Sequence, residues 1–154
     1  MARRNAVLLY TDGSFMVNLR NRGGWAAVLV FPCGSLKVRQ GQENQTTNNR
    51  MELTAVIEGL RDLKCLSKKF KTVEVYSDST YIVKTVNTKR LYRWLDSEWK
   101  KTNGKEIKNS DLWKELLCVM EGIDITFKHV KSHSGDLYNE LADSLAKEAC
   151  LHGM

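Results

Sequence analysis

One stretch, Ala6-Val-Leu-Leu-Tyr-Thr-Asp-Gly-Ser14, passes from a continuous apolar run to polar residues at Thr11. A short run of this kind is typical of a central strand buried on both faces. The stretch Thr72-Val-Glu-Val-Tyr76 has the same form and also precedes an aspartate. If the two strands are neighbours, Asp12 and Asp78 lie side by side at the sheet edge where ligands collect. Their mutual repulsion disfavours this arrangement unless a cation is present.

The other elements follow from hydrophobic periodicity and turn residues. Residues 25–31 and 35–42 are expected to be strands that form an antiparallel meander with the first strand, and 123–130 to be the last strand. Helices are predicted over 49–64, 81–86, 90–101, 111–121 and 137–151, the first with Thr47 or Asn48 as its N-cap. Strands first, followed by alternating helices and strands, predict an α/β (mixed α+β) domain with helical crossovers.

Composition limits the class of protein further. The 154 residues, 42% of them hydrophobic, are enough for one ordinary core, so we expect a single domain over residues 1–154. Twenty-four Lys and Arg against 18 Asp and Glu give a charge of +6, which favours a polyanionic partner. Nucleic acid, heparin-like sugar and anionic membrane satisfy charge alone. The longest N-terminal apolar run, Ala6 to Tyr10, is too short to span a membrane, and we expect a soluble, intracellular, cytoplasmic protein.

The cysteines suggest neither a metal knuckle nor a disulfide framework. They are widely spaced and form no C-x-x-C pair. We expect all four to be reduced and most to be buried small hydrophobes. They are Cys33, Cys65, Cys118 and Cys150.

Several segments occur together in a recognisable order. They are Tyr10-Thr-Asp-Gly-Ser14, Thr46-Thr-Asn-Asn-Arg-Met-Glu-Leu53, Tyr76-Ser-Asp-Ser79, Lys108-Asn-Ser-Asp-Leu-Trp113, and His133-Ser-Gly135 followed by Asn139-Glu140 and Asp143. In this order they resemble the cellular type of ribonuclease H with a basic protrusion. The resemblance covers Leu8 to about Ala149 and implies a central five-stranded mixed sheet with helices on both faces.

The resemblance also implies an activity: endonucleolytic hydrolysis of the RNA strand of RNA/DNA hybrids. Asp12, Glu52, Asp78 and Asp143 match the metal-binding carboxylates, and His133 matches the catalytic histidine of a loop. In the family, one magnesium ion activates the attacking water and a second stabilises the leaving 3′ oxygen, which gives 5′-phosphate and 3′-hydroxyl ends. Manganese is the alternative ion, and the partner implied is the hybrid, bound by a monomer, with neither membrane nor protein partner.

Physical chemistry asks for the same residue types. Magnesium is a hard cation that prefers oxygen ligands, and two ions about 4 Å apart can clamp both oxygens of an in-line phosphoryl displacement. Two dications also offset the four acids, so that an anionic phosphodiester can approach.

Substrate contacts carry over from the same resemblance. Thr47 and Asn109 match residues that hold a phosphate of the DNA strand, whereas Gly13, Asn48 and Asn49 match contacts around the minor groove and the 2′-hydroxyls. The protrusion corresponds to Lys89–Lys108, with contacts from Trp94, Trp99, Lys100, Lys101 and Lys105. This chain departs from some relatives at Gln45 and Arg90, and in the loop Phe15–Arg22.

Each assignment has a simpler alternative. A lone strand-end aspartate is more often a turn former than a metal ligand. The lysines could be an ordinary solvated face, and Trp94 and Trp99 could be core residues, as we expect Trp113 to be. His129 is a rival of His133, but it falls inside a predicted strand. Asp136 is a rival of Asp143, but it belongs to a loop.

Two other functions are alternatives to a hybrid-specific endonuclease. One is a nucleic-acid-binding domain of the same fold that has lost catalysis, which the intact acids and histidine disfavour. The other is a junction or DNA nuclease of the wider superfamily. The sequence leaves open whether the chain stands alone or belongs to a longer polypeptide such as a reverse transcriptase.

Overall fold

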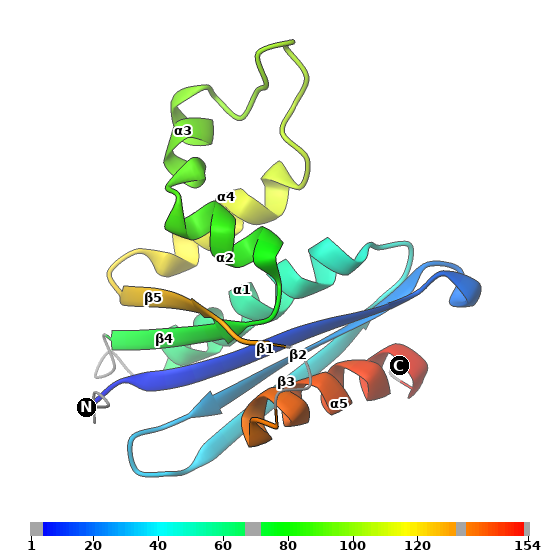
Figure 1. The fold of residues 1–154 in the computed structure, drawn as a ribbon, viewed down its shortest axis with the longest axis vertical. Helices are drawn as coiled ribbons and strands as arrows, with labels where there is room; N and C mark the ends of the chain where they lie inside the picture. Colours follow the sequence, from blue (N-terminus) through cyan, green and yellow to red (C-terminus); the bar gives the residue numbers. More distant parts are fainter. Residues whose placement is uncertain (1–4, 67–71, 132–134, 153–154) are drawn as a thin grey trace.

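A mixed sheet in the order β3-β2-β1-β4-β5 forms the centre of the structure (Figure 1). The structure is a computed structural model that describes residues 5–66, 72–131 and 135–152. The strands are β1 (Val7–Met16), β2 (Arg22–Val30), β3 (Leu36–Glu43), β4 (Thr72–Ser77) and β5 (Asp124–His129). The helices are α1 (Asn48–Leu66), α2 (Thr80–Asn87), α3 (Arg90–Asp96), α4 (Ser110–Met120) and α5 (Leu137–His152), and a 3₁₀ turn, η1, spans Val17–Leu19. The expected five-stranded sheet with an antiparallel meander is confirmed.

The central strand β1 is longer than the sequence predicts. It pairs in parallel with β4 from Val7↔Val73 to Tyr10↔Tyr76, whereas its antiparallel pairing with β2 continues to Met16↔Arg22. The prediction that the strand ends at Thr11 is therefore wrong, because β2 continues to pair with the polar residues. The sheet is stepped at this point: β1 runs on beyond the last residue that it pairs with β4.

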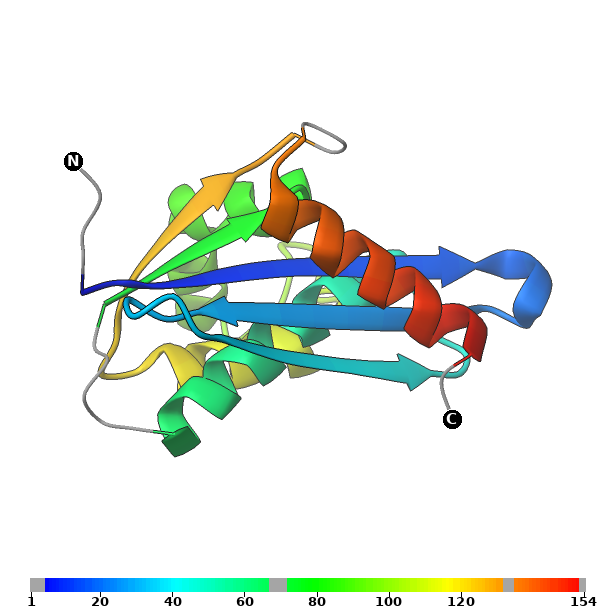
Figure 2. The ribbon, with the colours of Figure 1, turned by 90° about the horizontal axis from the view of Figure 1, so that it is seen from below.

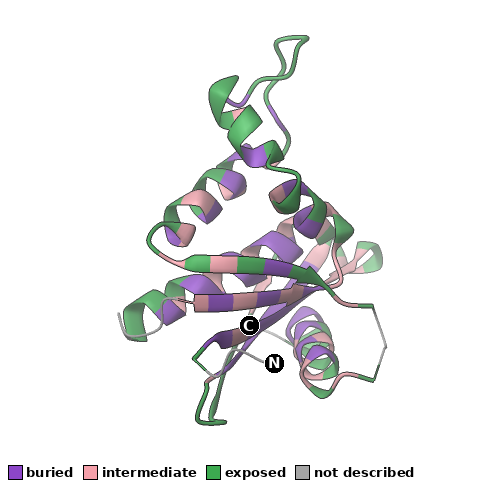
Figure 3. Ribbon diagram, turned by 60° about the vertical axis from the view of Figure 1, so that its left-hand side comes forward, coloured by how far each residue is buried: buried purple, intermediate pink, exposed green. Residues whose placement is uncertain are grey.

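Helices cover both faces of the sheet (Figure 2). The C-terminal helix α5 crosses one face, in contact with β1, β2 and β3, and α1 packs on the other face against β1 and β2, with α4 packed on α1. Side chains from β1, α1 and β4 form the larger core between the sheet and α1, and Figure 3 colours many residues of these elements as buried. No helix within the described ranges combines the length and apolar character needed to cross a membrane.

Helix α1 forms as the sequence predicts. Its apolar residues recur at helical spacing and are buried against the sheet: Leu53, Val56, Ile57, Leu60 and Leu63. The Thr47 hydroxyl oxygen accepts a hydrogen bond of 3.2 Å from the Arg50 backbone N–H, so Thr47, rather than Asn48, is the N-cap.

The helix predicted over 90–101 is too long. Helix α3 ends at Asp96, because Glu98 and Trp99 have φ values of 56° and 63°, which a right-handed helix does not allow. The chain then forms an exposed loop in which Lys100 and Glu106 make an isolated antiparallel bridge. This loop and α3 project away from the sheet (Figure 1).

The expectation of mostly buried cysteines is also wrong. All four are free thiols, but Cys33, Cys65 and Cys118 are exposed and only Cys150 is buried. Cys33 lies in the turn between β2 and β3, Cys65 in the last turn of α1, and Cys118 on the outer side of α4. Helical periodicity alone did not distinguish these outer positions from the core.

Gly24 of β2 lies directly under α5. A Cβ at this position would come within 2.3 Å of the Ala146 carbonyl oxygen and 2.4 Å of the Cys150 backbone nitrogen. Both are backbone atoms of the helix, so a larger residue at position 24 would displace α5 as a whole.

We predict that Gly24→Ala lowers the free energy of unfolding by about 3 kcal/mol or more, because the added methyl group overpacks a backbone contact. Urea denaturation measures this change. The control Gly34→Ala adds the same methyl group where no atom lies within 4 Å at a φ of 92°. It should cost only about 1–2 kcal/mol, for the left-handed backbone. Equal losses in the two variants would contradict the close packing of α5 on Gly24.

Candidate active site

Three carboxylates meet where the sheet is stepped. Asp12 lies on β1, Asp78 directly follows β4, and Glu52 lies in the second turn of α1. One oxygen of each lies within 4.8 Å of the others. The expectation that Asp12 and Asp78 lie side by side is confirmed, since β1 and β4 are parallel neighbours.

Gly13 allows Glu52 to reach this group. A Cβ at Gly13 would come within 2.7 Å of the Glu52 backbone nitrogen and 2.9 Å of Met51. Any side chain at this position would push the start of α1 away from β1. The sequence suggested only a substrate contact for Gly13, and the structure adds this packing role.

Burial and repulsion disfavour the charged forms of these acids. Asp12 and Glu52 are each 4% exposed. Burial, with Asp78 nearby, raises the pKa of Asp12 to about 8, although the Gly13 N–H donates a 2.9 Å hydrogen bond to its Oδ1. Burial and the same two aspartates raise the pKa of Glu52 well above its usual range.

The Glu52 Oε1 atom gives a direct test of whether a cation fits. It is buried and makes no hydrogen bond within the described part of the chain. A buried, unsatisfied carboxylate oxygen beside two aspartates costs free energy, and a hard cation with oxygen ligands would satisfy it. The donor set therefore fits a divalent cation such as magnesium.

The fourth predicted carboxylate, Asp143, joins the group from α5. Its carboxyl group lies close enough to Asp12 to contribute to the raised pKa of Asp12. It also forms an ion pair of 3.1 Å with Lys147, one turn along the helix. The structure thus brings together all four predicted acids, with Asp143 outside the most compact part of the cluster.

Of the two histidine candidates, the structure describes only the second. His133 lies outside the described residues. Its rival His129 is the last residue of β5, as the sequence indicates, and its Nε2 lies 3.2 Å from the Asp78 carbonyl oxygen. His129 thus contacts the backbone of a cluster residue, which the sequence did not suggest.

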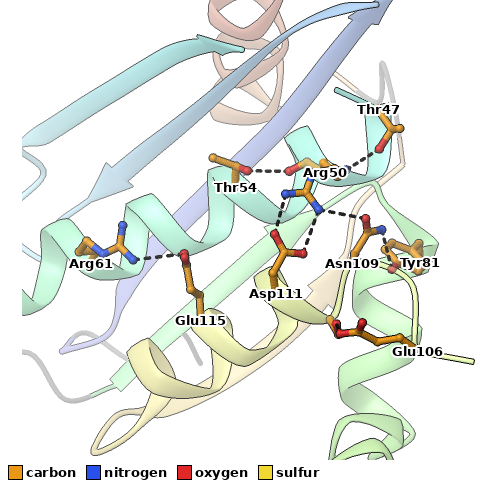
Figure 4. A network of polar contacts seen from close by, with 10 residues as sticks. Thr47, Arg50, Thr54, Arg61, Tyr81, Glu106, Asn109, Asp111 and Glu115 are labelled. Carbon is orange, nitrogen blue, oxygen red and sulfur yellow. Dashed lines mark hydrogen bonds and ion pairs between the residues drawn. The ribbon is translucent and has the colours of Figure 1, made fainter. Parts of the chain in front are cut away.

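Arg50 joins the two residues predicted to hold a DNA phosphate (Figure 4). Its guanidinium donates to both carboxylate oxygens of Asp111, at 2.8 and 3.0 Å, and to the Asn109 side-chain oxygen at 3.3 Å. Its backbone N–H donates to Thr47, and the Asn109 amide donates to the Tyr81 hydroxyl at 3.2 Å. Sequence reasoning missed Arg50 as a functional residue, although it lies inside the quoted motif.

The aromatic residues of the protrusion are mainly packing residues. Trp113 is fully buried, as predicted, and Trp94 lies between it and Trp99, with ring centroids 5.8 and 6.4 Å away. Trp99, expected to contact substrate, is only 7% exposed. Lys114 lies over its ring at 5.8 Å.

The remaining substrate candidates lie at the surface. Asn48 is exposed and Asn49 half-buried in the first turn of α1, at the end near the carboxylates. The basic residues of the loop between α3 and α4 are all exposed: Lys100, Lys101, Lys105 and Lys108. The loop projects at the end of the molecule away from α5 (Figure 1), so these lysines present positive charge there.

Comparison with known proteins gives consistent matches. The family model described as RNase H matches residues 4–151. A ribonuclease H of Caldicellulosiruptor saccharolyticus is 44% identical over 92% of this chain and 93% of its own length. One of Wolbachia pipientis is 44% identical over 96% of this chain and 97% of its own.

Solved structures agree with these matches. The crystal structure of LC9-RNase H1, a type 1 RNase H with the type 2 active-site motif, superposes with a TM-score of 0.84 at 30% identity, over 100% of this chain and 76% of that one. The crystal structure of LC11-RNase H1 in complex with RNA/DNA hybrid gives a TM-score of 0.69 at 26% identity, over 94% and 96%.

We predict that Asp12→Asn raises the melting temperature of the metal-free protein by several degrees, because it removes a charge that burial and Asp78 disfavour. Magnesium should raise the melting temperature of the parent and have a much smaller effect on the variant. Thermal unfolding in chelator and in magnesium measures both changes. Glu148→Gln, an exposed site on α5, should respond like the parent. A magnesium response retained in Asp12→Asn would remove Asp12 from the ligand set.

Proposed function

The chain belongs to the ribonuclease H family, and on that premise we propose that it is an endonuclease that hydrolyses the RNA strand of RNA/DNA hybrids at the cluster of Asp12, Glu52 and Asp78. The observation that carries the proposal is the approach of the three carboxylates to within 4.8 Å, with one buried oxygen unsatisfied. An inactive binding domain would have no need to maintain this repulsion.

Two magnesium ions, with manganese as the alternative, are the proposed cofactors. Asp12, Glu52, Asp78 and Asp143 would hold them. Bound magnesium would supply the positive charge that phosphodiester hydrolysis needs at both the attacking water and the leaving 3′ oxygen. Breaking the bond between phosphorus and the 3′ oxygen leaves 5′-phosphate and 3′-hydroxyl ends.

The chain's own residues have three roles in this proposal. The rigid sheet and the first turns of α1 hold the acids at fixed positions, so that little rearrangement accompanies the reaction. Asn48, Asn49 and Gly13 would contact the hybrid beside the cluster, where the RNA 2′-hydroxyl distinguishes RNA from DNA. His133 would handle a proton or assist product release.

The DNA strand would be held at two further places. Thr47 and Asn109, joined through Arg50, would receive one phosphate. Lys100, Lys101 and Lys105, together with Trp94 of α3, would contact the DNA backbone farther along. The LC11-RNase H1 structure, solved with RNA/DNA hybrid, supports a hybrid as the ligand of this fold.

The activity is tested by comparing substrates and variants. In magnesium, the chain should cleave an RNA/DNA hybrid and leave duplex RNA and duplex DNA intact. Glu52→Gln and Asp78→Asn should each reduce hybrid cleavage at least a hundredfold, because each removes a charged ligand, whereas Glu148→Gln should cleave at the parent rate. Gel analysis of end-labelled strands measures rate and end groups. A variant that retained a tenth of the parent rate would exclude its residue as a metal ligand, and cleavage of duplex DNA instead would make the chain a DNA nuclease.

We further predict that replacing Lys100, Lys101 and Lys105 with alanine weakens hybrid binding and flattens its salt dependence, by roughly 1 in slope for each lysine lost. The turnover rate at saturating substrate should not change, because no acid of the cluster is altered. Binding titrations at several salt concentrations measure the slope. The control Lys37→Ala/Lys64→Ala lowers the net charge on β3 and at the end of α1, and should keep the parent slope. An unchanged slope in the triple variant would make the loop an ordinary solvated surface.

A further inference from the structure

Asn109 occupies the N-cap position of α4, but its side chain does not cap the helix. Asparagine is common at N-caps because its side chain usually accepts a hydrogen bond from the first turn. Here the backbone is left-handed, with a φ of 62°, and the backbone carbonyl oxygen accepts from the Leu112 and Trp113 N–H groups at 3.0 Å each. The side-chain amide lies between Arg50 of α1 and Tyr81 of α2 (Figure 4). Other elements therefore hold this amide, and its own helix does not.

Neighbours that can only donate hydrogen bonds fix the direction of the amide. A guanidinium and an indole N–H are both donors without an acceptor. Arg50 donates to the amide at 3.3 Å, so the amide atom that faces it is the oxygen, Oδ1. The nitrogen, Nδ2, then donates to the Tyr81 hydroxyl oxygen at 3.2 Å. The same hydroxyl oxygen accepts from Nε1 of the buried Trp113 at 2.9 Å, which fixes its position.

One N–H of the Asn109 amide remains for a ligand. Its oxygen faces Arg50 and one Nδ2 hydrogen is directed to Tyr81, whereas the second has no acceptor in the described part of the chain. Thr47 keeps a donor in the same way, because its hydroxyl oxygen accepts from the Arg50 backbone N–H and that bond does not use its hydrogen. Phosphate oxygens accept hydrogen bonds, and uncharged side chains often supply them. The two donors therefore suit a phosphate.

We propose that Tyr81 is a positioning residue for substrate: its hydroxyl, held by Trp113, orients the Asn109 amide so that the second N–H donates to a phosphate of the DNA strand. The inference rests on the proposed function, in which Asn109 receives that phosphate. Tyr81 lies in the first turn of α2, three positions after Asp78. One short segment thus carries both a cluster acid and the residue that orients the phosphate contact.

Tyr76 offers a matched control. It is half-buried, as Tyr81 is, and its hydroxyl donates to Glu74 at 2.6 Å. Glu74 pairs with Lys128 of β5 at 3.3 Å, so this contact stays within the sheet and does not reach α4. Each Tyr→Phe variant loses one oxygen and keeps its ring, which for Tyr81 packs against Trp113 with ring centroids 5.3 Å apart. A difference between the variants therefore reports on the Tyr81 hydroxyl.

The experiment measures the affinity of the full chain for RNA/DNA hybrids in which one DNA phosphate at a time is replaced by an uncharged methylphosphonate. Binding is measured in chelator, so that nothing is cleaved. The parent should lose about fivefold in affinity at one position, which Asn109→Ala identifies by losing its sensitivity there. Tyr81→Phe should bind the unmodified hybrid about threefold more weakly and lose most of its sensitivity at the same position. Tyr76→Phe should keep the parent pattern.

Two further measurements separate this role from a purely structural one. In an Asn109→Ala background, Tyr81→Phe should cause no further loss of affinity, because the residue through which it acts is absent. In nitrogen-15 spectra of the free protein, hydrogen exchange at the Asn109 side-chain amide should be faster in Tyr81→Phe than in the parent and unchanged in Tyr76→Phe. The second measurement needs neither substrate nor activity.

Other results would overturn the inference. If Asn109→Ala kept the parent's affinity and phosphate sensitivity, the phosphate contact would be wrong and the role of Tyr81 would fail with it. If Asn109→Ala lost the contact but Tyr81→Phe matched Tyr76→Phe, the contact would stand and the Tyr81 hydroxyl would only stabilise the core. A further loss from Tyr81→Phe in the Asn109→Ala background would show that Tyr81 acts elsewhere. None of these measurements uses cleavage, so a chain that bound hybrid without cutting it would refute the proposed endonuclease and leave this inference standing.

Discussion

Electrostatic repulsion among buried carboxylates is the constraint on which the rest of the structure depends. Asp12, Glu52 and Asp78 come from a strand, a helix and a strand end, and burial and their mutual repulsion raise the pKa of Asp12 and Glu52. Like charges repel one another, so free carboxylates in water would move apart. A rigid protein frame is needed to hold them together. The frame consists of β1 and β4 in parallel register and of α1 held close to β1 at Gly13. The cluster therefore costs stability locally, and its oxygen ligands could hold a metal ion.

The order of the elements could be predicted because hydrophobic periodicity is a local signal. The run Ala6–Tyr10 and the spacing of Leu53, Val56 and Leu60 show which segments are strands and helices without reference to the rest of the chain. Local signals did not predict where an element ends when the end depends on residues far away in the sequence. Strand β1 continues to Met16 because β2 pairs with it, and α3 ends early because the chain turns at Glu98 and Trp99 to bury the indole of Trp99.

For the candidate site too, local motifs could be predicted from the sequence, whereas contacts between distant segments could not. The family motifs indicated each of the four acids, and the structure brings them together. The sequence could not predict contacts between elements: Arg50 binds Asp111, which is 61 positions away, and the Tyr10 ring packs against Tyr138 of α5. Such pairs have no spacing rule, since the fold alone decides which side chains meet. Arg50 joins α1 to α4 two positions before Glu52, so one such polar contact lies beside the acids in the sequence.

The step in the sheet determines where Asp12 lies relative to the neighbouring strands. Strand β1 continues beside β2 for six residues after its last pair with β4, so Asp12 lies on the part of β1 that β4 does not pair with. If the chain cleaves a nucleic-acid duplex as proposed, the scissile strand would have to reach the acids at this point, beside the end of β4 and along the part of β1 that only β2 pairs with.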